Sequence, residues 1–474
     1  MAQDRYLADF EQFEKNGAAK EPSWVHQIRK AAISRFAELG FPTTQHEEWK
    51  YTSVAPIVKV PFRPADYEPD GLMKESLSLH TLGQAACAQL VFVNGRYSPA
   101  LSSLRSLPDG VKAGSLSTAL SADPIAVEPH LARHASYQNH PFVALNTAFL
   151  QDGAFVSIPK GKVVERPIHL LFVSTAPFSS AHVRPASTEL SAGFGSAQDR
   201  RGEAIVSHPR NLILAGDDSQ TMIVESYIGL NNALYFTNVV TEIVAGENAV
   251  VAHYKLQRES EEAFHIATVQ AHLGRSSNFS SHSVDLGGAL VRNDVNAVLD
   301  GQGIECTLDG LYMVAGRQHV DNHTRIDHVK PHCSSRELYK GVLGGRSKGV
   351  FNGKIYVHKD AQKTDAKQTN KNLLLSEGAV INTKPQLEIY ADDVKCTHGS
   401  TIGQLDQEAI FYLRSRGIDL EAARGLLTYA FASEMIGRIK VEPIRAQLEH
   451  LLLTRLPEGS QPAVLRSLVG EGTP

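Results

Sequence analysis

Hydrophobic and polar residues alternate over the middle of the chain and follow a helical spacing near both ends. From Ala154 onward, for about 245 residues, short runs rich in Val, Ile and Tyr are interrupted by Gly, Asn and Asp. Alternation with a period of two is typical of half-buried strands, and no convincing amphipathic helix interrupts it. The pattern therefore predicts a long, mainly β body with helical regions before and after it.

Turn-like segments recur along the β-rich body at nearly regular intervals. Their starting points are 28, 27, 29, 15, 31 and 15 residues apart, at Gly246, Gly274, Gly301, Lys330, Gly345, Ser376 and Ala391. A unit of 28 to 31 residues that divides into halves of about 15 is what the stacked coils of a β-solenoid give. A β-sandwich is the competing fold, but its turn signals would recur roughly every 8 to 12 residues. We therefore expect a solenoid.

The N-terminal region shows signals for both helices and strands. Residues 23–39 place apolar side chains at helical spacing, with Ser23 as the expected N-cap and Gly40 as the expected end. Residues 89–94 read QLVFVN and predict a strand, and residues 141–150 predict a short helix. We interpret the apolar face of residues 23–39 as core packing.

Helical spacing returns after residue 403. Asp406 is expected to cap a helix that ends at Gly417, and Asp419 is expected to cap a second helix. The apolar positions of residues 406–440 exceed what a short helical hairpin can bury against itself. Part of this surface should therefore be available to a partner.

Three regions follow from these patterns. Residues 1–150 form a mixed helical N-terminal region, residues 151–403 the β-solenoid core, and residues 404–474 a helical C-terminal region. Residues 175–207 are poor in large apolar side chains and rich in Ser, Ala, Gly and Arg. Too little apolar surface is available there to offset the entropy of ordering, so we expect a mobile insertion between coils.

The composition argues against several classes of protein. The 47 basic and 51 acidic residues leave a formal charge of -4, which provides no broad basic field for nucleic acid and no polybasic patch for a membrane surface. The N-terminus carries acidic residues where a secretory signal needs a basic start, and no window approaches the ~18 apolar residues of a membrane span. We therefore expect a cytoplasmic protein that binds neither nucleic acid nor membrane.

The cysteines and glycines also exclude common motifs. Four cysteines, Cys87, Cys306, Cys333 and Cys396, lie far apart and form no Cys-x-x-Cys pair, which argues against a zinc ribbon and against a disulfide framework. The nearest approach to a phosphate-binding loop, GVFNGKI, has too few residues between its glycines and carries Ile355 where Ser or Thr would hold magnesium. The chain alone is not expected to hydrolyse a nucleotide by that chemistry.

One stretch, from Lys384 to Gly399, combines a strand pattern with residues capable of metal chemistry. It reads KPQLEIYADDVKCTHG and alternates over its first part. If the strand continues, Cys396 and His398 lie two residues apart and project from the same face. A thiolate and an imidazole side by side can share a metal ion or a sulfur species, although Lys395 would favour the thiolate only if its side chain bends back. A buried cysteine beside a surface histidine is the alternative that spacing alone leaves open.

Many other metal-capable side chains lie upstream of this pair, namely His319, His323, His328, His332, Cys333 and His358. Neighbouring strand residues face opposite ways, so His332 and Cys333 need a bulge to face one ion. Stacked coils could instead bring Cys306 and Cys333 together. We favour structural or surface histidines over a conventional zinc site.

Acidic residues suggest a competing function. Asp321, Asp327 and Asp365 could line a groove in the way that polysaccharide-cleaving β-helices use carboxylates. Nothing in the linear sequence pairs them, and a cytoplasmic location argues against a secreted carbohydrate enzyme. An enzyme acting on a polymer remains the alternative from another class.

Several segments closely resemble the SufB and SufD family of iron-sulfur cluster assembly scaffolds. They are EEWKYT (47–52), SHPRN (207–211), HTRIDHVKPHCSSRELYKG (323–341), GVFNGKI (349–355), TDAKQTNKNLLLS (364–376), the Lys384 to Gly399 run and AIFYLRSRG (409–417). The resemblance covers nearly the whole chain and is densest and most specific from about 319 to 417. The family member SufB looks less similar, because it lacks the KPQLEIYADDVKC run.

The resemblance implies a right-handed parallel β-helix between helical regions, in a scaffold subunit that is not an enzyme by itself. It implies pairing with SufB through the end of the β-helix and with the ATPase SufC through the C-terminal helices, and a homodimer when the chain is alone. A nascent iron-sulfur cluster would form at the SufB interface, with the family's site histidine at His398 and its neighbouring cysteine at Cys396. Reduced flavin is connected with the assembled complex, although no motif marks a flavin pocket. A purely structural subunit, in which both residues are inert, is a third hypothesis.

Overall fold

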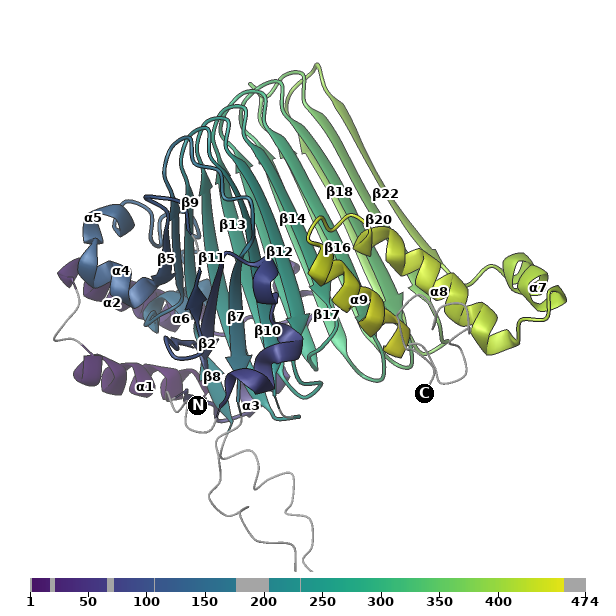
Figure 1. Ribbon diagram of the computed structural model, residues 1–474, viewed down its shortest axis with the longest axis horizontal. Coiled ribbons are helices and arrows are strands. Elements are labelled where there is room, and N and C mark those ends of the chain that lie inside the picture. Colours follow the sequence, from purple (N-terminus) through teal and green to yellow (C-terminus); the bar gives the residue numbers. More distant parts are fainter. Residues whose placement is uncertain are drawn as a thin grey trace, which may run out of the picture.

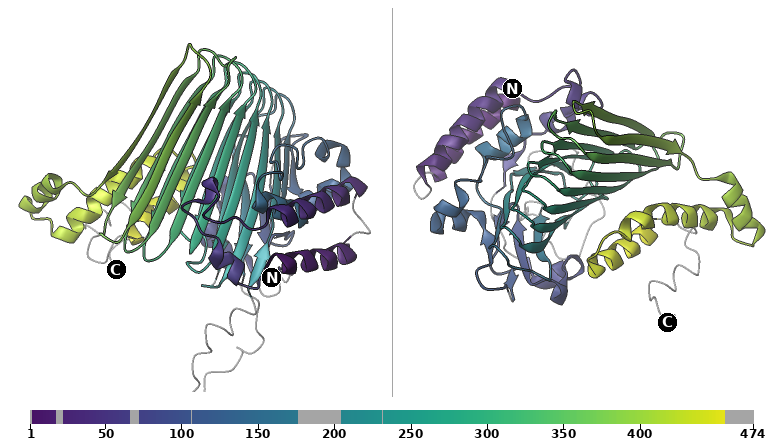
Figure 2. Two further views of the ribbon diagram at one scale, coloured as in Figure 1. Left: turned by 180° about the vertical axis from the view of Figure 1, so that it is seen from behind. Right: turned by 90° about the horizontal axis from the view of Figure 1, so that it is seen from above.

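The middle of the chain folds into a parallel β-solenoid of about seven turns, as a computed structural model shows (Figure 1). The structure describes residues 2–17, 22–65, 72–105, 107–175, 204–230 and 232–455. Helices lie against the early coils at one end and beside the late coils at the other (Figure 2). The predicted mainly β fold with helical flanks is confirmed.

Two sheets of eleven strands each form the body of the described chain. The first sheet has the order β21 (Val380–Ile389), β19 (Lys348–Val357), β17 (His319–His328), β15 (Leu290–Leu299), β13 (Phe264–Leu273), β11 (Tyr235–Ala245), β9 (Arg210–Ala215), β6 (Ala154–Ile158) and β5 (Lys112–Ser115), with β8 (Ile205–Ser207) beside β11 and β1 (Arg63–Pro64) beside β8. The second has the order β22 (Lys395–Gly403), β20 (Asp365–Leu374), β18 (Ser334–Leu343), β16 (Glu305–Val314), β14 (Asn278–Asp285), β12 (Val250–Arg258), β10 (Gln220–Gly229), β7 (Ile168–Ser174), β2 (Ala88–Val93) and β3 (Arg96–Tyr97), with β4 (Ser103–Leu104) beside β2.

Strand pairing distinguishes the solenoid from the β-sandwich. From β9 to β22, consecutive strands belong to opposite sheets, and each pairs in parallel with the strand one coil earlier. Val250, for example, pairs with Gln220 on one side and with Asn278 on the other. These partners lie 30 and 28 residues away, which is the unit that the turn segments predict.

Glycines at the turns allow the coils to stack closely. A Cβ atom on Gly301 would lie 2.3 Å from the backbone nitrogen of Arg275 in the preceding coil, and one on Gly246 would lie 2.7 Å from the backbone nitrogen of Asp217. No side chain fits at such distances, so these positions require glycine. The regular glycine spacing in the sequence therefore reflects backbone contact between successive coils.

Helices of the N-terminal region pack on the early coils. They are α1 (Ala2–Gly17), α2 (Ser23–Leu39), η1 (Glu47–Trp49), α3 (Ala55–Lys59), η2 (Lys74–His80), η3 (Gly83–Ala85), α4 (Leu116–Ala122), α5 (Pro124–Val127) and α6 (Pro141–Ala148). Phe36 of α2 and Phe142 of α6 share a buried cluster with Phe236 of β11. The helices expected at 23–39 and 141–150 and the strand expected at 89–94 are confirmed. The expected cap is wrong, because Ser23 is already helical and Pro22 occupies the cap position, whereas Gly40 ends α2 as predicted with φ 62°.

Residues 47–52, which we call the N-terminal strap, cross the outer face of the first sheet. The guanidinium of Arg292 on β15 lies 3.8 Å from the ring centre of Trp49, and its Nη1 donates to Asp321 on β17 at 2.9 Å. Glu47 forms an ion pair with Lys384 of β21. The strap therefore contacts the middle of the solenoid at β15 as well as its last coil at β21.

The C-terminal region contains α7 (Gln407–Ser415), α8 (Leu420–Ile436) and α9 (Glu442–Arg455). Asp406 and Asp419 accept hydrogen bonds from backbone nitrogens in the first turns of α7 and α8, as the sequence predicts. Helices α8 and α9 bury apolar residues against the second sheet. In contrast, α7 projects away from the solenoid (Figure 2) and leaves Phe411 and Tyr412 74% and 57% exposed.

The division into residues 1–150, 151–403 and 404–474 stays a prediction. Strand β2 pairs with β7, so the second sheet continues across the first boundary. The expected mobile insertion at 175–207 lies almost entirely outside the described residues. Of the helices that the structure describes, none is both long and apolar enough to cross a membrane.

Candidate functional site

The two sheets both end in a strand with an open edge. Within the described chain, β21 pairs only with β19, and β22 pairs only with β20. The backbone donors and acceptors on the other side of each strand have no strand to bind. The late end of the solenoid is therefore an open coil, and Cys396 and His398 lie on it.

The stretch that the sequence suggested as one strand is divided between the two sheets. Residues Lys384 to Ile389 belong to β21, the chain turns, and β22 begins at Lys395. The strand that begins before Lys384 therefore does not continue to Gly399. Cys396 and His398 nevertheless lie two residues apart on β22 and share one face.

That shared face is the interior of the solenoid. In β20, Ala366 and Gln368 pair with Cys396 and His398, and both are buried, at 0% and 1% exposure. Neighbouring residues of a parallel pair point to the same side of the sheet. Cys396 is half-buried, whereas His398 is exposed because no further coil covers it.

The surroundings of Cys396 favour its protonated form. Burial raises the pKa of the thiol, a backbone hydrogen bond from Ala366 lowers it, and the carboxylate of Asp365 raises it further. Lys395 alternates with Cys396 along the strand and faces outward. The suggestion that Lys395 could favour the thiolate is therefore not supported, and a bound metal or a partner would have to displace the thiol proton.

The other metal-capable residues do not converge. His319 contacts Thr52 of the strap, His323 forms ion pairs with Asp321 and Glu48, and His328 is buried, with its pKa lowered to about 4 by burial. Within the described ranges, no group of three His, Cys, Asp or Glu side chains could hold a metal ion. The preference for structural or surface histidines over a conventional zinc site stays a prediction.

Each of the three aspartates that the polymer-cleaving hypothesis needs forms an ion pair with an arginine. Asp321 pairs with Arg292 at 2.9 Å, Asp327 with Arg325 at 2.9 Å, and Asp365 with Arg336 at 2.7 Å. Asp321 and Asp327 lie on β17 of the first sheet, whereas Asp365 lies on β20 of the second. These three carboxylates therefore do not form the facing pair that glycoside hydrolysis needs.

Two buried residues behind His398 were missed from the sequence. Gln368 of β20 pairs with His398, and Glu337 of β18 pairs with Gln368. The three side chains therefore form one column on the inward face of the second sheet. Gln368 Nε2 donates to Glu337 Oε2 at 2.8 Å. Their spacing of 31 and 30 residues matches the coil unit, and this is the signal that could have revealed them.

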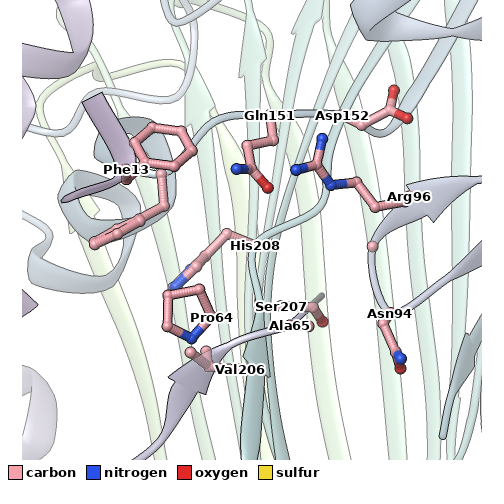
Figure 3. Close-up of a pocket in the computed structure, with 12 residues that line it drawn as sticks. Phe13, Pro64, Ala65, Asn94, Arg96, Gln151, Asp152, Val206, Ser207 and His208 are labelled. Atoms are coloured by element: carbon pink, nitrogen blue, oxygen red, sulfur yellow. The ribbon is translucent and has the colours of Figure 1, made fainter. Parts of the chain in front are cut away.

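A small pocket lies at the early end of the solenoid (Figure 3), where Phe13, Arg96 and His208 are among the residues that line it. His208 stacks on Phe149 with ring centres 5.2 Å apart, and burial lowers its pKa to about 3. Its lining residues come from β1, β3, β8 and the segments beside them, many coils away from β22. It is therefore separate from the open coil.

Comparisons with known proteins match both the early and the late regions. The SufBD core domain of SUF system FeS cluster assembly matches residues 197–431, and the SufBD protein N-terminal region matches residues 1–170. A SufBD family iron-sulfur cluster assembly protein of Synechocystis is 33% identical over 448 residues, which cover 92% of each chain.

Two proteins with the printed name iron-sulfur cluster assembly protein SufD are also similar. That of Escherichia coli is 31% identical over 450 residues, 95% of this chain and 96% of its own length. That of Bacillus subtilis is 26% identical over 445 residues, 90% of this chain and 93% of its own length. Because these matches extend over most of its length, the chain belongs to the SufBD family of iron-sulfur cluster assembly proteins.

Proposed function

We propose that this chain is a scaffold subunit of the SUF machinery that pairs with SufB and the ATPase SufC to build and transfer nascent iron-sulfur clusters. The observation that carries the proposal is the position of Cys396 and His398 at the open end of the solenoid, beside two unpaired strand edges. In this role the chain is not an enzyme by itself and supplies one half of a shared site in a cytoplasmic complex.

The chemistry of the two side chains suits a transient cluster. Thiolate and imidazole are soft or borderline ligands for iron, and two ligands from one chain leave positions for a partner to fill. A closed cage of four cysteines would retain its product, whereas an incomplete site can release it. In the proposal His398 is the principal ligand in this chain, and Cys396 is secondary because its thiol must first lose a proton.

The open edges suit addition of strands by SufB. Unpaired strand edges tend to pair with another chain, and main-chain hydrogen bonds across such an edge give affinity. Strands of SufB beside β21 and β22 would cover His398 and bring their own ligands next to it. The same edges would let two copies of this chain pair when SufB is absent.

Helix α7 is the proposed contact for SufC. It carries the exposed Phe411 and Tyr412, whereas α8 and α9 use their apolar residues against the solenoid. Nucleotide hydrolysis then belongs to SufC, in agreement with the missing phosphate-binding loop. The role of reduced flavin in the assembled complex rests on the family resemblance alone.

Replacement of His398 tests the proposal. The complex would be reconstituted from this chain, SufB and SufC with a cysteine desulfurase and ferrous iron, and iron and sulfide would be counted per complex. We expect His398→Ala to reduce cluster formation severely while the subunits still assemble, because an exposed residue on β22 contributes little to folding. A normal cluster yield would favour the purely structural subunit instead.

A further inference from the structure

The coil directly behind the open coil contains a buried acceptor without a donor. Gln368 is 1% exposed, its Nε2 donates to Glu337, and its Oε1 has no hydrogen-bond partner among the described residues. A buried carbonyl oxygen without a hydrogen bond destabilises the folded chain. Such a group calls for a partner that is missing in the isolated chain.

The direction of the Gln368 amide follows from its contacts. A Cβ atom on Gly353 in the opposite sheet would lie 2.3 Å from Gln368 Nε2, so the amide extends across the interior. Because Nε2 is directed to Glu337 in the coil before, Oε1 is left to face another way. In the coil that follows, the residue in the same column is His398.

From this column we propose that Gln368 is a positioning residue for His398, and that Glu337 fixes the amide of Gln368 in the orientation that presents Oε1 to the imidazole. The inference rests on the proposed function of His398. Once a partner covers the open coil, the exposed imidazole turns inward and donates one ring N–H to Gln368 Oε1. The other ring nitrogen is then unprotonated and directed at iron.

This arrangement follows a general rule for histidine ligands. A metal-binding histidine usually donates its second ring N–H to an oxygen acceptor, which fixes the tautomer and the ring orientation, and loss of that acceptor typically lowers metal affinity about 10- to 100-fold. An amide can present either its oxygen or its nitrogen. Glu337 therefore decides which end His398 meets, because its Oε2 accepts from Gln368 Nε2 at 2.8 Å and so directs Oε1 away from itself.

A matched residue in an earlier coil provides the control. Gln257 is also buried inside the second sheet, and its Nε2 donates to Glu259 Oε2 at 3.1 Å. Its Oε1, however, already accepts from the backbone nitrogen of Gly287 at 2.9 Å. Gln257 is thus likewise buried and donates its amide N–H to a glutamate, but its oxygen acceptor is already occupied and no proposed histidine ligand lies beside it.

The test measures cluster formation by the reconstituted complex as a function of ferrous iron concentration. Gln368→Met, which keeps the length but removes the acceptor, should raise the half-saturating iron concentration by about 10-fold or more, while the cluster yield at saturating iron is retained. Gln368→Glu keeps an oxygen acceptor and should stay within about 3-fold of the unmodified chain. Gln257→Met should leave the half-saturating concentration unchanged.

The outcomes distinguish a failure of the positioning role of Gln368 from a failure of the proposed function. Equal shifts in Gln368→Met and Gln257→Met, an unshifted Gln368→Met, or a Gln368→Glu variant as poor as Gln368→Met would overturn the positioning role. His398→Ala is measured alongside, and an undiminished cluster yield in that variant would overturn the proposed function itself. If Gln368→Met fails to assemble, Glu337→Gln decides, because it keeps a hydrogen-bond partner but frees the amide to turn; an unchanged iron dependence would then refute the inference.

Discussion

Ile389→Pro tests whether the outer edge of β21 is covered by a strand of SufB. The backbone N–H groups of Val380 and Tyr390 donate to Ser347 and Val357 at 3.0 and 2.9 Å, so every second N–H of β21 points to β19. Ile389 lies one residue from Tyr390, and its N–H therefore points outward. Proline at this position removes a donor from the open edge and leaves the ladder with β19 intact.

The expected loss of heterodimer affinity follows from the removal of this one backbone donor. One hydrogen bond contributes about 0.5–1.5 kcal/mol, and 1.4 kcal/mol corresponds to a tenfold change in affinity. The proline ring also projects into the space that a neighbouring strand would occupy. We therefore expect Ile389→Pro to weaken the heterodimer about tenfold or more, whereas edge strands themselves tolerate proline.

Isothermal titration calorimetry of SufB with the variant measures this loss of heterodimer affinity directly. Glu388→Pro is the matched control one residue away, because the N–H of Glu388 points to β19 and its loss should lower the thermal midpoint of the chain alone. A proline placed within residues 176–203 should affect neither quantity. Equal dimer affinities for Ile389→Pro and for that control proline would refute strand addition at β21.

Further predictions concern the site, the tail and the interior. In cluster reconstitution, His398→Ala should impair formation severely and Cys396→Ser partially, while Cys87→Ser, buried in the N-terminal region, should have no effect; the reverse order would contradict the assignment. Deletion from Leu405 onward should abolish SufC binding in a pull-down but retain the β-strand signal of the solenoid in circular dichroism. Retained SufC binding would exclude α7 as the contact. Burial raises the pKa of Glu337 to about 7 from its ordinary 4.5, so the unfolded chain loses this proton at lower pH than the folded chain. Stability should therefore fall by about 3 kcal/mol as pH rises from about 4.5 to 7, and thermal midpoints of Glu337→Gln should lack this decline.

The sequence predicts the solenoid well because its turns need glycine. Gly246, Gly274 and Gly301 lie where coils touch through their backbones, so their spacing gives the coil length without any structure. The caps at Asp406 and Asp419 are equally local, since each side chain bonds within its own helix. Signals that depend on a few neighbouring residues can be identified from the linear chain.

Other features depend on register, which the linear sequence does not define. Glu337 and Gln368 look like ordinary strand residues until the pairing places them behind His398. The turn between Ile389 and Lys395 coincides with the turn-like segment at Ala391, but the assignment of the strands on its two sides to opposite sheets depends on pairing. Likewise, exposure of Phe411 on α7 depends on how α8 and α9 dock, and that docking is a tertiary contact.

Contacts of the N-terminal strap determine the order in which the chain can finish folding during synthesis. Glu47 and its partner Lys384 are 337 residues apart in sequence. At a synthesis rate of about 5–20 residues per second, roughly 20 to 70 s pass between the emergence of the two residues from the ribosome. Coils can stack one upon another in that interval, but the strap cannot form its contact with Lys384. A nascent chain therefore has most of its stacked coils before the N-terminal strap is fully docked.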